Sequence, residues 1–196
     1  MKRFGIFGGT FNPPHIAHSI IAEDVREQMH LDKIIFIPSG NPPLKTVDVS
    51  AEHRFNMAKL AFGNDPHFEV SDIEMNTAER SYTVDTLIKL KGKYQNDFVK
   101  LYLILGIDAL AGFQKWKDPN KLFLLSEVLI VNRPDHLVQD VAAEFSNRVK
   151  YLSVPMLEIS SSIIREYIQN NKSIKYLVNP EVDSYIKEHD LYKLSS

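Results

Sequence analysis

Short apolar runs recur along the chain with the length and composition of buried β-strands. They are rich in Val, Ile, Leu and Phe, and polar, Gly or Pro residues bound them, which is typical of strands covered on both faces. We interpret six runs as strands: FGIF (4–7), KIIFIP (33–38), HFEVSDI (67–73), VKLYLIL (99–105), EVLIVN (127–132) and VKYLSV (149–154).

Segments between these runs carry apolar residues every three or four positions, as amphipathic helices do. The predicted helices cover residues 18–29, 50–62, 82–94 and 136–148. Strands and helices therefore alternate, which favours a Rossmann-like α/β fold: a doubly wound parallel sheet with helices on both faces.

The C-terminal segment departs from this alternation. It predicts two helices, 160–171 and 179–192, with no strand between them. We expect one domain, 1–196, in which a Rossmann-like core (1–157) carries a small C-terminal helical subdomain (158–196) as a cap packed on the sheet.

Composition narrows the classes of protein that fit. At 196 residues with 44% hydrophobic residues, the chain is long enough for one sizeable core. It has no cysteine, which excludes disulfides, thiolate zinc sites and a cysteine nucleophile. A net charge of -2 gives no bulk reason to bind nucleic acid.

The sequence carries neither a secretion signal nor a membrane-spanning segment that we can recognise. The first residues, MKRFGIFGG, contain no signal-like apolar core, and no run approaches the roughly 20 apolar residues of a membrane span. We expect a soluble, cytoplasmic protein with no nucleic-acid or membrane partner; whether it forms a homo-oligomer stays open.

The loop GGTFNPPHIAH (8–18) links the first strand to the first helix, at the sheet edge where α/β proteins bind ligands. Gly8 and Gly9 let the backbone approach a ligand, and the free N–H groups of the helix start favour an anion. Two prolines stiffen the turn. His15 and His18, three residues apart, lie on one side of the first turn and would point nitrogen donors at a phosphate.

Two alternatives explain the histidines without a phosphate. His15 and His18 could bind zinc, although the HExxH spacing and thiolate partners are missing. They could also cap the helix without any ligand.

The loop resembles the signature of the nucleotidyltransferase superfamily with an (H/T)-x-G-H motif, with Ala17 where the family has Gly. EISSSIIRE (158–166) resembles the second signature of that superfamily, ISSTxIR, with Ser162 in place of Thr. The two elements stand in the expected order on the expected fold. The resemblance implies that ATP is bound by Gly8, Gly9, Thr10, Phe11, His18, Ile159, Ser160, Ser161, Ser162 and Arg165.

Three further stretches resemble the bacterial nicotinate mononucleotide adenylyltransferases, so the similarity covers nearly the whole chain. They are IPSGNPPLK (37–45), in which Leu44 replaces the usual His, RSYTVDTL (80–87) and LGIDALAGFQKWKD (105–118). The implied substrate-binding residues are Lys45, Tyr82, Thr83, Trp116 and Lys117.

These residue types suit a pyridine nucleotide. Trp116 supplies an aromatic plane for the ring, or is a half-buried core residue. Main-chain N–H groups around Tyr82, Thr83 and Trp116–Lys117 would favour the carboxylate of nicotinate. Such neutral donors also bind the oxygen of an amide, so the choice of acid over amide is what the resemblance implies.

The remaining candidates concern ATP. Gly106 and Asp108 form the family's G-x-D element, in which Asp108 takes ribose hydroxyls or serves as an N-cap. Arg133, in NRPDH, lies near the adenine side of ATP or is an exposed loop residue. Arg54 is expected as a solvated charge on a helix face.

The resemblance implies transfer of the adenylyl group of ATP to nicotinate mononucleotide, which gives nicotinate adenine dinucleotide and pyrophosphate, with Mg²⁺ arriving on ATP. The catalytic residues would be His15, His18, Lys45 and Arg165, acting by positioning and electrostatics. Alternatives are an adenylyltransferase for nicotinamide mononucleotide or phosphopantetheine, a cytidylyltransferase, and a non-catalytic nucleotide-binding module.

Overall fold

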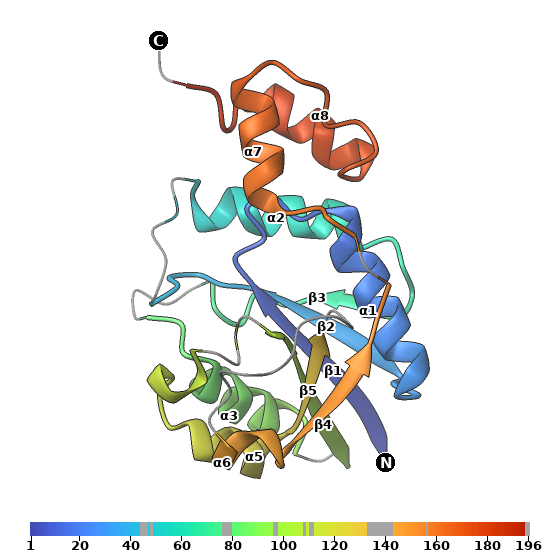
Figure 1. The fold of residues 1–196 in the computed structure, drawn as a ribbon, viewed down its shortest axis with the longest axis vertical. Coiled ribbons are helices and arrows are strands. Elements are labelled where there is room, and N and C mark those ends of the chain that lie inside the picture. Colours follow the sequence, from blue (N-terminus) through green and yellow to red (C-terminus); the bar gives the residue numbers. More distant parts are fainter. Residues whose placement is uncertain are drawn as a thin grey trace.

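A six-stranded, entirely parallel sheet forms the centre of the molecule (Figure 1). The computed structural model describes residues 1–43, 47, 49–75, 80–95, 98–107, 109, 112–132, 143–155 and 157–194. The strands are β1 (Lys2–Gly9), β2 (Lys33–Pro38), β3 (Phe68–Val70), β4 (Val99–Gly106), β5 (Glu127–Asn132) and β6 (Val149–Ser153). Their order, β3-β2-β1-β4-β5-β6, is that of a doubly wound sheet and confirms the predicted fold class.

Helices cover both faces of the sheet. On one face lie α1 (Ile16–Gln28) and α2 (Ala51–Phe62), whose buried residues share a core with those of the strands. The other face is covered by α3 (Thr83–Lys93), the short 3₁₀ helix η1 (Phe113–Lys115), α5 (Pro119–Leu125) and α6 (Ala143–Ser146). Figure 1 shows α3, α5 and α6 grouped on that side.

The C-terminal helices α7 (Ser161–Gln169) and α8 (Pro180–Glu188) pack on α2 (Figure 1). α2 packs against both the C-terminal helices and the sheet. Met57 lies in the apolar cluster of the C-terminal helices, and the next residue, Ala58, lies in the core against the sheet. The C-terminal helices therefore pack on a helix of the core, whereas we predicted that they would pack on the sheet. The division at residues 157/158 stays a prediction.

Most predicted elements are confirmed, and the differences have local reasons. The strand predicted over 67–73 is limited to β3, and the helix predicted over 136–148 is described only as α6, because 133–142 lie outside the described residues. We did not predict η1 or α5, since both are short and α5 runs directly into the apolar pattern of β5. Within the described ranges no helix is long and apolar enough to cross a membrane.

Candidate active site

The carboxyl ends of the parallel strands meet at one edge of the sheet, and the opening loop leaves that edge from the centre. β1 lies between β2 and β4, with Gly9 in register with Pro38. A Cβ at Gly8 would meet no atom within 4 Å, whereas one at Gly9 would come 3.1 Å from the ring of Phe11. Gly8 therefore faces open space, as the predicted ligand approach requires.

His15 and His18 lie together at the start of α1, with ring centroids 3.7 Å apart. His15 is the N-cap residue, and its main-chain N–H donates to Nδ1 of His18 at 3.1 Å. Because a main-chain N–H can only donate, Nδ1 of His18 is the unprotonated nitrogen, and the proton of the neutral ring lies on Nε2. This hydrogen bond fixes which nitrogen of His18 can donate to a ligand.

Both imidazoles are neutral at pH 7, because burial lowers their pKa values. Burial lowers the pKa of His15 from 6.5 to about 4. Burial also holds the pKa of His18 well below its usual range, and the nearby His15 lowers it further. The ring of His18 is enclosed by aromatic side chains, with ring centroids 5.1 Å from Phe11 and 6.0 Å from Phe7.

The start of α7 lies against the opening loop, so the two signature elements are in direct contact. Ser161 Oγ donates to the carbonyl of Pro13 at 2.7 Å, and the guanidinium of Arg165 donates to the carbonyl of Asn12 at 2.8 Å. Ser160 Oγ accepts from the N–H of Ile163 and thereby caps the helix. The donors that these contacts leave for an anion are the hydroxyl of Ser160 and the N–H groups of the first two residues of α7, Ser161 and Ser162.

The C-terminal tail reaches the same loop. The hydroxyl of Tyr192 donates to Oδ1 of Asn12 at 2.8 Å, across 180 residues of sequence. Burial raises the pKa of Tyr192, so its hydroxyl keeps the proton that it donates. Neither Asn12 nor Tyr192 was in the sequence-based set of site residues, although Asn12 lies inside the first signature motif, because their contact joins segments far apart in the sequence.

A cavity of about 350 Å³ extends from the opening loop to the start of α3. It joins predicted ATP-binding residues to predicted substrate-binding residues. Its walls come from six stretches of the chain and comprise Gly8, Gly9, Thr10, Ile37, Ser39, Pro42, Pro43, Glu74, Arg80, Ser81, Tyr82, Thr83, Val84, Leu103, Leu105, Lys115, Trp116 and Lys117.

The far end of this cavity combines aromatic side chains with positive charge. Tyr82 is the N-cap of α3 and makes no side-chain cap, which leaves the first N–H groups of the helix open to a ligand. Lys117 Nζ lies 2.8 Å from the carboxylate of Asp85 and 5.0 Å from the ring centroid of Tyr82. The N–H of Trp116, which we expected to face the substrate, instead donates to Phe113 at 3.1 Å because η1 ends there.

Three charged residues of the cavity wall were not among the predicted site residues: Glu74, Arg80 and Lys115. Glu74 is buried and accepts a hydrogen bond of 2.5 Å from the hydroxyl of Thr86. Arg80 is exposed and directly precedes the segment SYTVDTL. Arg80 and Lys115 both lie inside stretches that carry the family resemblance, which was the available signal; Glu74 had none.

The expectation for Arg54 was wrong. Its side chain is 1% exposed, and its guanidinium donates to the carbonyls of Thr10, Gly40 and Val49. A residue in the first turn of a helix is exposed only if no loop covers it, and here loops from three places converge on it.

The other predicted residues divide into two groups. Gly106 ends β4 in an exposed position, and Ile159 packs against the apolar cluster of the C-terminal helices. Three predicted residues lie outside the described part of the chain: Lys45, Asp108 and Arg133.

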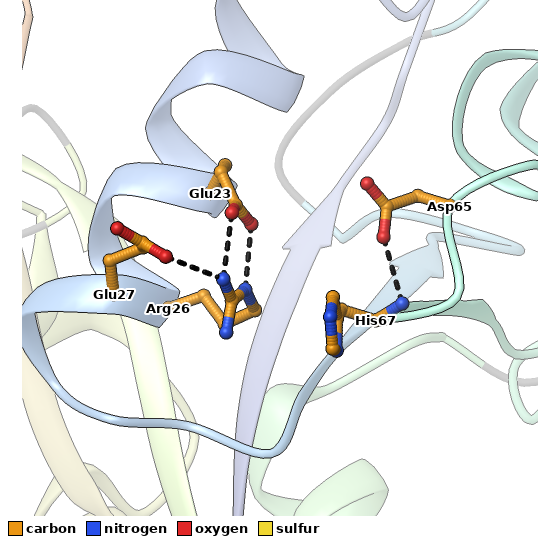
Figure 2. Close-up of polar contacts among 5 residues, drawn as sticks. All are labelled: Glu23, Arg26, Glu27, Asp65 and His67. Atoms are coloured by element: carbon orange, nitrogen blue, oxygen red, sulfur yellow. Dashed lines mark hydrogen bonds and ion pairs between the residues drawn. The ribbon is translucent and has the colours of Figure 1, made fainter.

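A separate group of charged residues lies away from this edge, on α1 and before β3 (Figure 2). Arg26 donates to Glu23 at 2.7 Å and to Glu27 at 2.9 Å. Asp65 accepts the main-chain N–H of His67 at 2.8 Å. None of the five residues drawn in Figure 2 lines the cavity described above.

Comparisons with known proteins agree with this geometry. The cytidylyltransferase-like family model matches residues 6–167. A probable nicotinate-nucleotide adenylyltransferase of Lachnoclostridium phytofermentans is 36% identical over 201 residues, covering 98% of this chain and 100% of the relative. Another, from Oceanobacillus iheyensis, is 38% identical, and the match covers 98% of this chain and 97% of the relative.

A solved structure shares the fold. The nicotinic acid mononucleotide adenylyltransferase of Plasmodium falciparum, complexed with NaAD, superposes with a TM-score of 0.80 at 24% identity, over 98% of both chains. The family model and the near full-length relatives together decide the assignment. The chain belongs to the cytidylyltransferase-like family and, within it, to the nicotinate-nucleotide adenylyltransferases.

Proposed function

We propose that this site transfers the adenylyl group of ATP to the phosphate of nicotinate mononucleotide. The products are nicotinate adenine dinucleotide, in which the pyridine base keeps its acid, and pyrophosphate. The observation that carries the proposal is the single cavity that joins the opening loop to the aromatic pocket at α3 and η1. Family membership supports the same reaction.

The chemistry requires no covalent intermediate. A phosphate oxygen of the mononucleotide attacks the α-phosphorus of ATP and forms a new P–O bond. The bond from the α-phosphorus to the bridging oxygen breaks, and pyrophosphate leaves with that oxygen and its electron pair. Because the attacking phosphate is already ionised at neutral pH, the protein contributes alignment and charge stabilisation.

The residues around the α-phosphate would act as fixed donors. His18 donates from Nε2 to the oxygens on which charge develops, and His15 lies against it. Arg165 adds positive charge from α7 while it holds the carbonyl of Asn12. Lys45 is proposed for the same role from the loop after β2.

ATP binding is assigned to both signature elements. The opening loop, Gly8 to Phe11, meets the phosphates, and the start of α7 offers its N–H groups to the β- and γ-phosphates. The proposed ATP site further includes Gly106, Asp108, Arg133, Ile159, Ser160, Ser161 and Ser162.

Magnesium would enter with ATP as part of the substrate. In the described ranges no three His, Asp or Glu side chains converge in a metal site. The donors near the triphosphate are imidazoles, a guanidinium and main-chain N–H groups, which suit phosphate oxygens and not a hard cation. The ion would be held by the triphosphate itself.

The pocket at the other end suits a pyridine acid. Trp116 and Tyr82 supply aromatic surfaces for the ring. Thr83 is the first residue of α3, and the N–H groups at a helix N-terminus bind anions favourably. Lys117 adds positive charge at the mouth, although Asp85 partly neutralises it. The carboxylate of nicotinate therefore gains more here than a neutral amide.

The decisive experiment follows pyrophosphate release from magnesium ATP with each of three acceptors: nicotinate mononucleotide, nicotinamide mononucleotide and phosphopantetheine. We expect the highest kcat/KM with the nicotinate compound. Equal values for the first two would contradict the preference for the acid. A clear preference for phosphopantetheine, or no release with any acceptor, would overturn the proposed function.

A further inference from the structure

Arg54 is a buried cation that makes its hydrogen bonds to main-chain carbonyls. Nη1 donates to Thr10 at 2.8 Å, Nη2 to Gly40 at 3.1 Å, and Nε to Val49 at 3.3 Å. Each of its nitrogens therefore holds a different segment of chain. A side chain that only filled space in the core would not need three directed donors.

The three carbonyls come from segments that form or border the candidate site. Thr10 belongs to the opening loop after β1, and Gly40 belongs to the loop after β2. Val49 directly precedes the N-cap of α2, the helix that carries Arg54. One guanidinium thus fixes the first two site loops relative to α2.

The loop after β2 is in turn fixed to the acceptor pocket. A Cβ at Gly40 would come 2.0 Å from the carbonyl oxygen of Glu74, so the two backbones are in close contact. Asn41 and Ser81 exchange two hydrogen bonds: the N–H of Ser81 donates to the carbonyl of Asn41 at 2.9 Å, and the N–H of Asn41 donates to Ser81 Oγ at 3.1 Å. Tyr82 follows immediately.

A continuous series of contacts therefore leads from the opening loop to the aromatic pocket. Arg54 connects the first two parts of this series, the loop after β1 and the loop after β2. The planar guanidinium presents donors in fixed directions, which a lysine ammonium does not. Burial lowers the pKa of Arg54, while Glu74 and Tyr192 raise it, and the group stays charged because arginine starts from a very high pKa.

We propose that Arg54 is a positioning residue for adenylyl transfer: it holds the α-phosphate loop and the acceptor pocket at the separation that in-line attack requires. The inference rests on the proposed function. It assigns Arg54 no contact with either nucleotide, so its effect falls on the relative placement of the two substrates and not on the binding of each one.

The test compares Arg54→Met and Arg54→Lys with Leu31→Ala. Met keeps the length of the side chain but has no donor, and Lys keeps the charge without the planar fork. Leu31 is 2% exposed in the core and lies before the amino end of β2, whereas the site loops leave the carboxyl ends of the strands, so its truncation destabilises the fold from the other edge of the sheet. Rates are measured well below each Tm and divided by the folded fraction from circular dichroism.

We expect kcat of Arg54→Met to fall about a hundredfold, because a displacement of about 1 Å costs that much in a reaction between two positioned groups. The KM values for both substrates should change by less than about threefold, since the loss falls on alignment. Arg54→Lys should lie between Met and the natural residue. Leu31→Ala should keep the natural kcat.

A rescue experiment separates positioning from general stability. Methylguanidinium added to Arg54→Ala should restore part of kcat, while the same addition should leave Leu31→Ala unchanged. The proposal is overturned if Arg54→Met and Leu31→Ala lose equal kcat at equal folded fraction, or if kcat of Arg54→Lys equals that of the natural protein. Inactivity of the natural protein would instead refute the proposed function.

Discussion

At the scale of single residues, His18 shows how a main-chain contact prepares a side chain for binding. The N–H of His15 occupies Nδ1 of His18, which leaves Nε2 as the donor. Because the aromatic rings of Phe7 and Phe11 enclose it, the imidazole has few other orientations open to it. Its donor is therefore positioned before substrate arrives, which is the arrangement that makes a hydrogen bond effective in a transition state.

Replacing His18 by Ala should lower kcat about a hundredfold, the order of loss when one preorganised donor is removed. His18→Gln, whose side-chain amide can place a donor near the position of Nε2, should recover part of this loss. Steady-state pyrophosphate release measures both variants.

The matched control for His18 is His67→Ala. His67 is exposed, and its main-chain N–H donates to Asp65 (Figure 2). It should keep the natural kcat. Near-normal turnover of His18→Ala would remove the imidazole from the catalytic role.

At the scale of elements, the C-terminal helices act on the site through the opening loop. α7 supplies Ser161 and Arg165, and the segment after α8 supplies Tyr192; together they hold Asn12 and Pro13. α2 lies between this group and the sheet, with Met57 directed to the C-terminal helices. The cap therefore sets the shape of a loop that the sheet alone would leave free.

Tyr192→Phe should weaken ATP binding and raise the KM for ATP about five- to tenfold, because one hydrogen bond to Asn12 is worth about 1 to 1.5 kcal/mol. The KM for the acceptor should change little, since the aromatic pocket lies at the far end of the cavity. Initial rates at varied ATP measure the effect.

Tyr176→Phe is the control, because Tyr176 lies between α7 and α8 and is 75% exposed. It should leave both KM values unchanged. Equal effects of the two substitutions would show that the hydroxyl of Tyr192 does not order the loop.

At the scale of the whole molecule, stability and the site are linked through buried histidines. The folded state keeps His15 neutral down to a pKa of about 4, whereas the unfolded chain protonates it near 6.5. Between these values the unfolded state binds more protons, so the free energy of unfolding rises with pH. His18, whose pKa is also lowered by burial, acts in the same direction.

We therefore expect the unfolding free energy to fall as pH drops from about 6.5 towards 4, by up to about 1.4 kcal/mol per pH unit for each buried imidazole. Urea unfolding at pH 7, 6 and 5 measures this slope. His15→Gln should flatten it. Identical slopes in the natural protein and His15→Gln would contradict the assignment of this pH dependence to the buried imidazole of His15.

Several parts of the fold and site were predictable because they depend on local pattern. The parallel strands follow from continuous apolar runs, and the edge at which GGTFNPPHIAH lies follows from its position after β1. The segments around Tyr82 and Trp116 were placed by motif, and the structure brings both to one cavity. η1 and α5 were missed because three and seven residues are too few to establish a helical period.

The sequence by itself determined the fold class and the family, because each depends on residue type and spacing along one segment. The roles of the site residues stay predictions. Only the tertiary structure decided how the segments meet. Burial of Arg54, the contact of Tyr192 with Asn12 and the use of the Trp116 N–H within η1 all depend on which distant backbone group lies opposite a side chain or N–H. Local pattern carries no information about such pairings, because they arise when segments far apart in sequence are packed together.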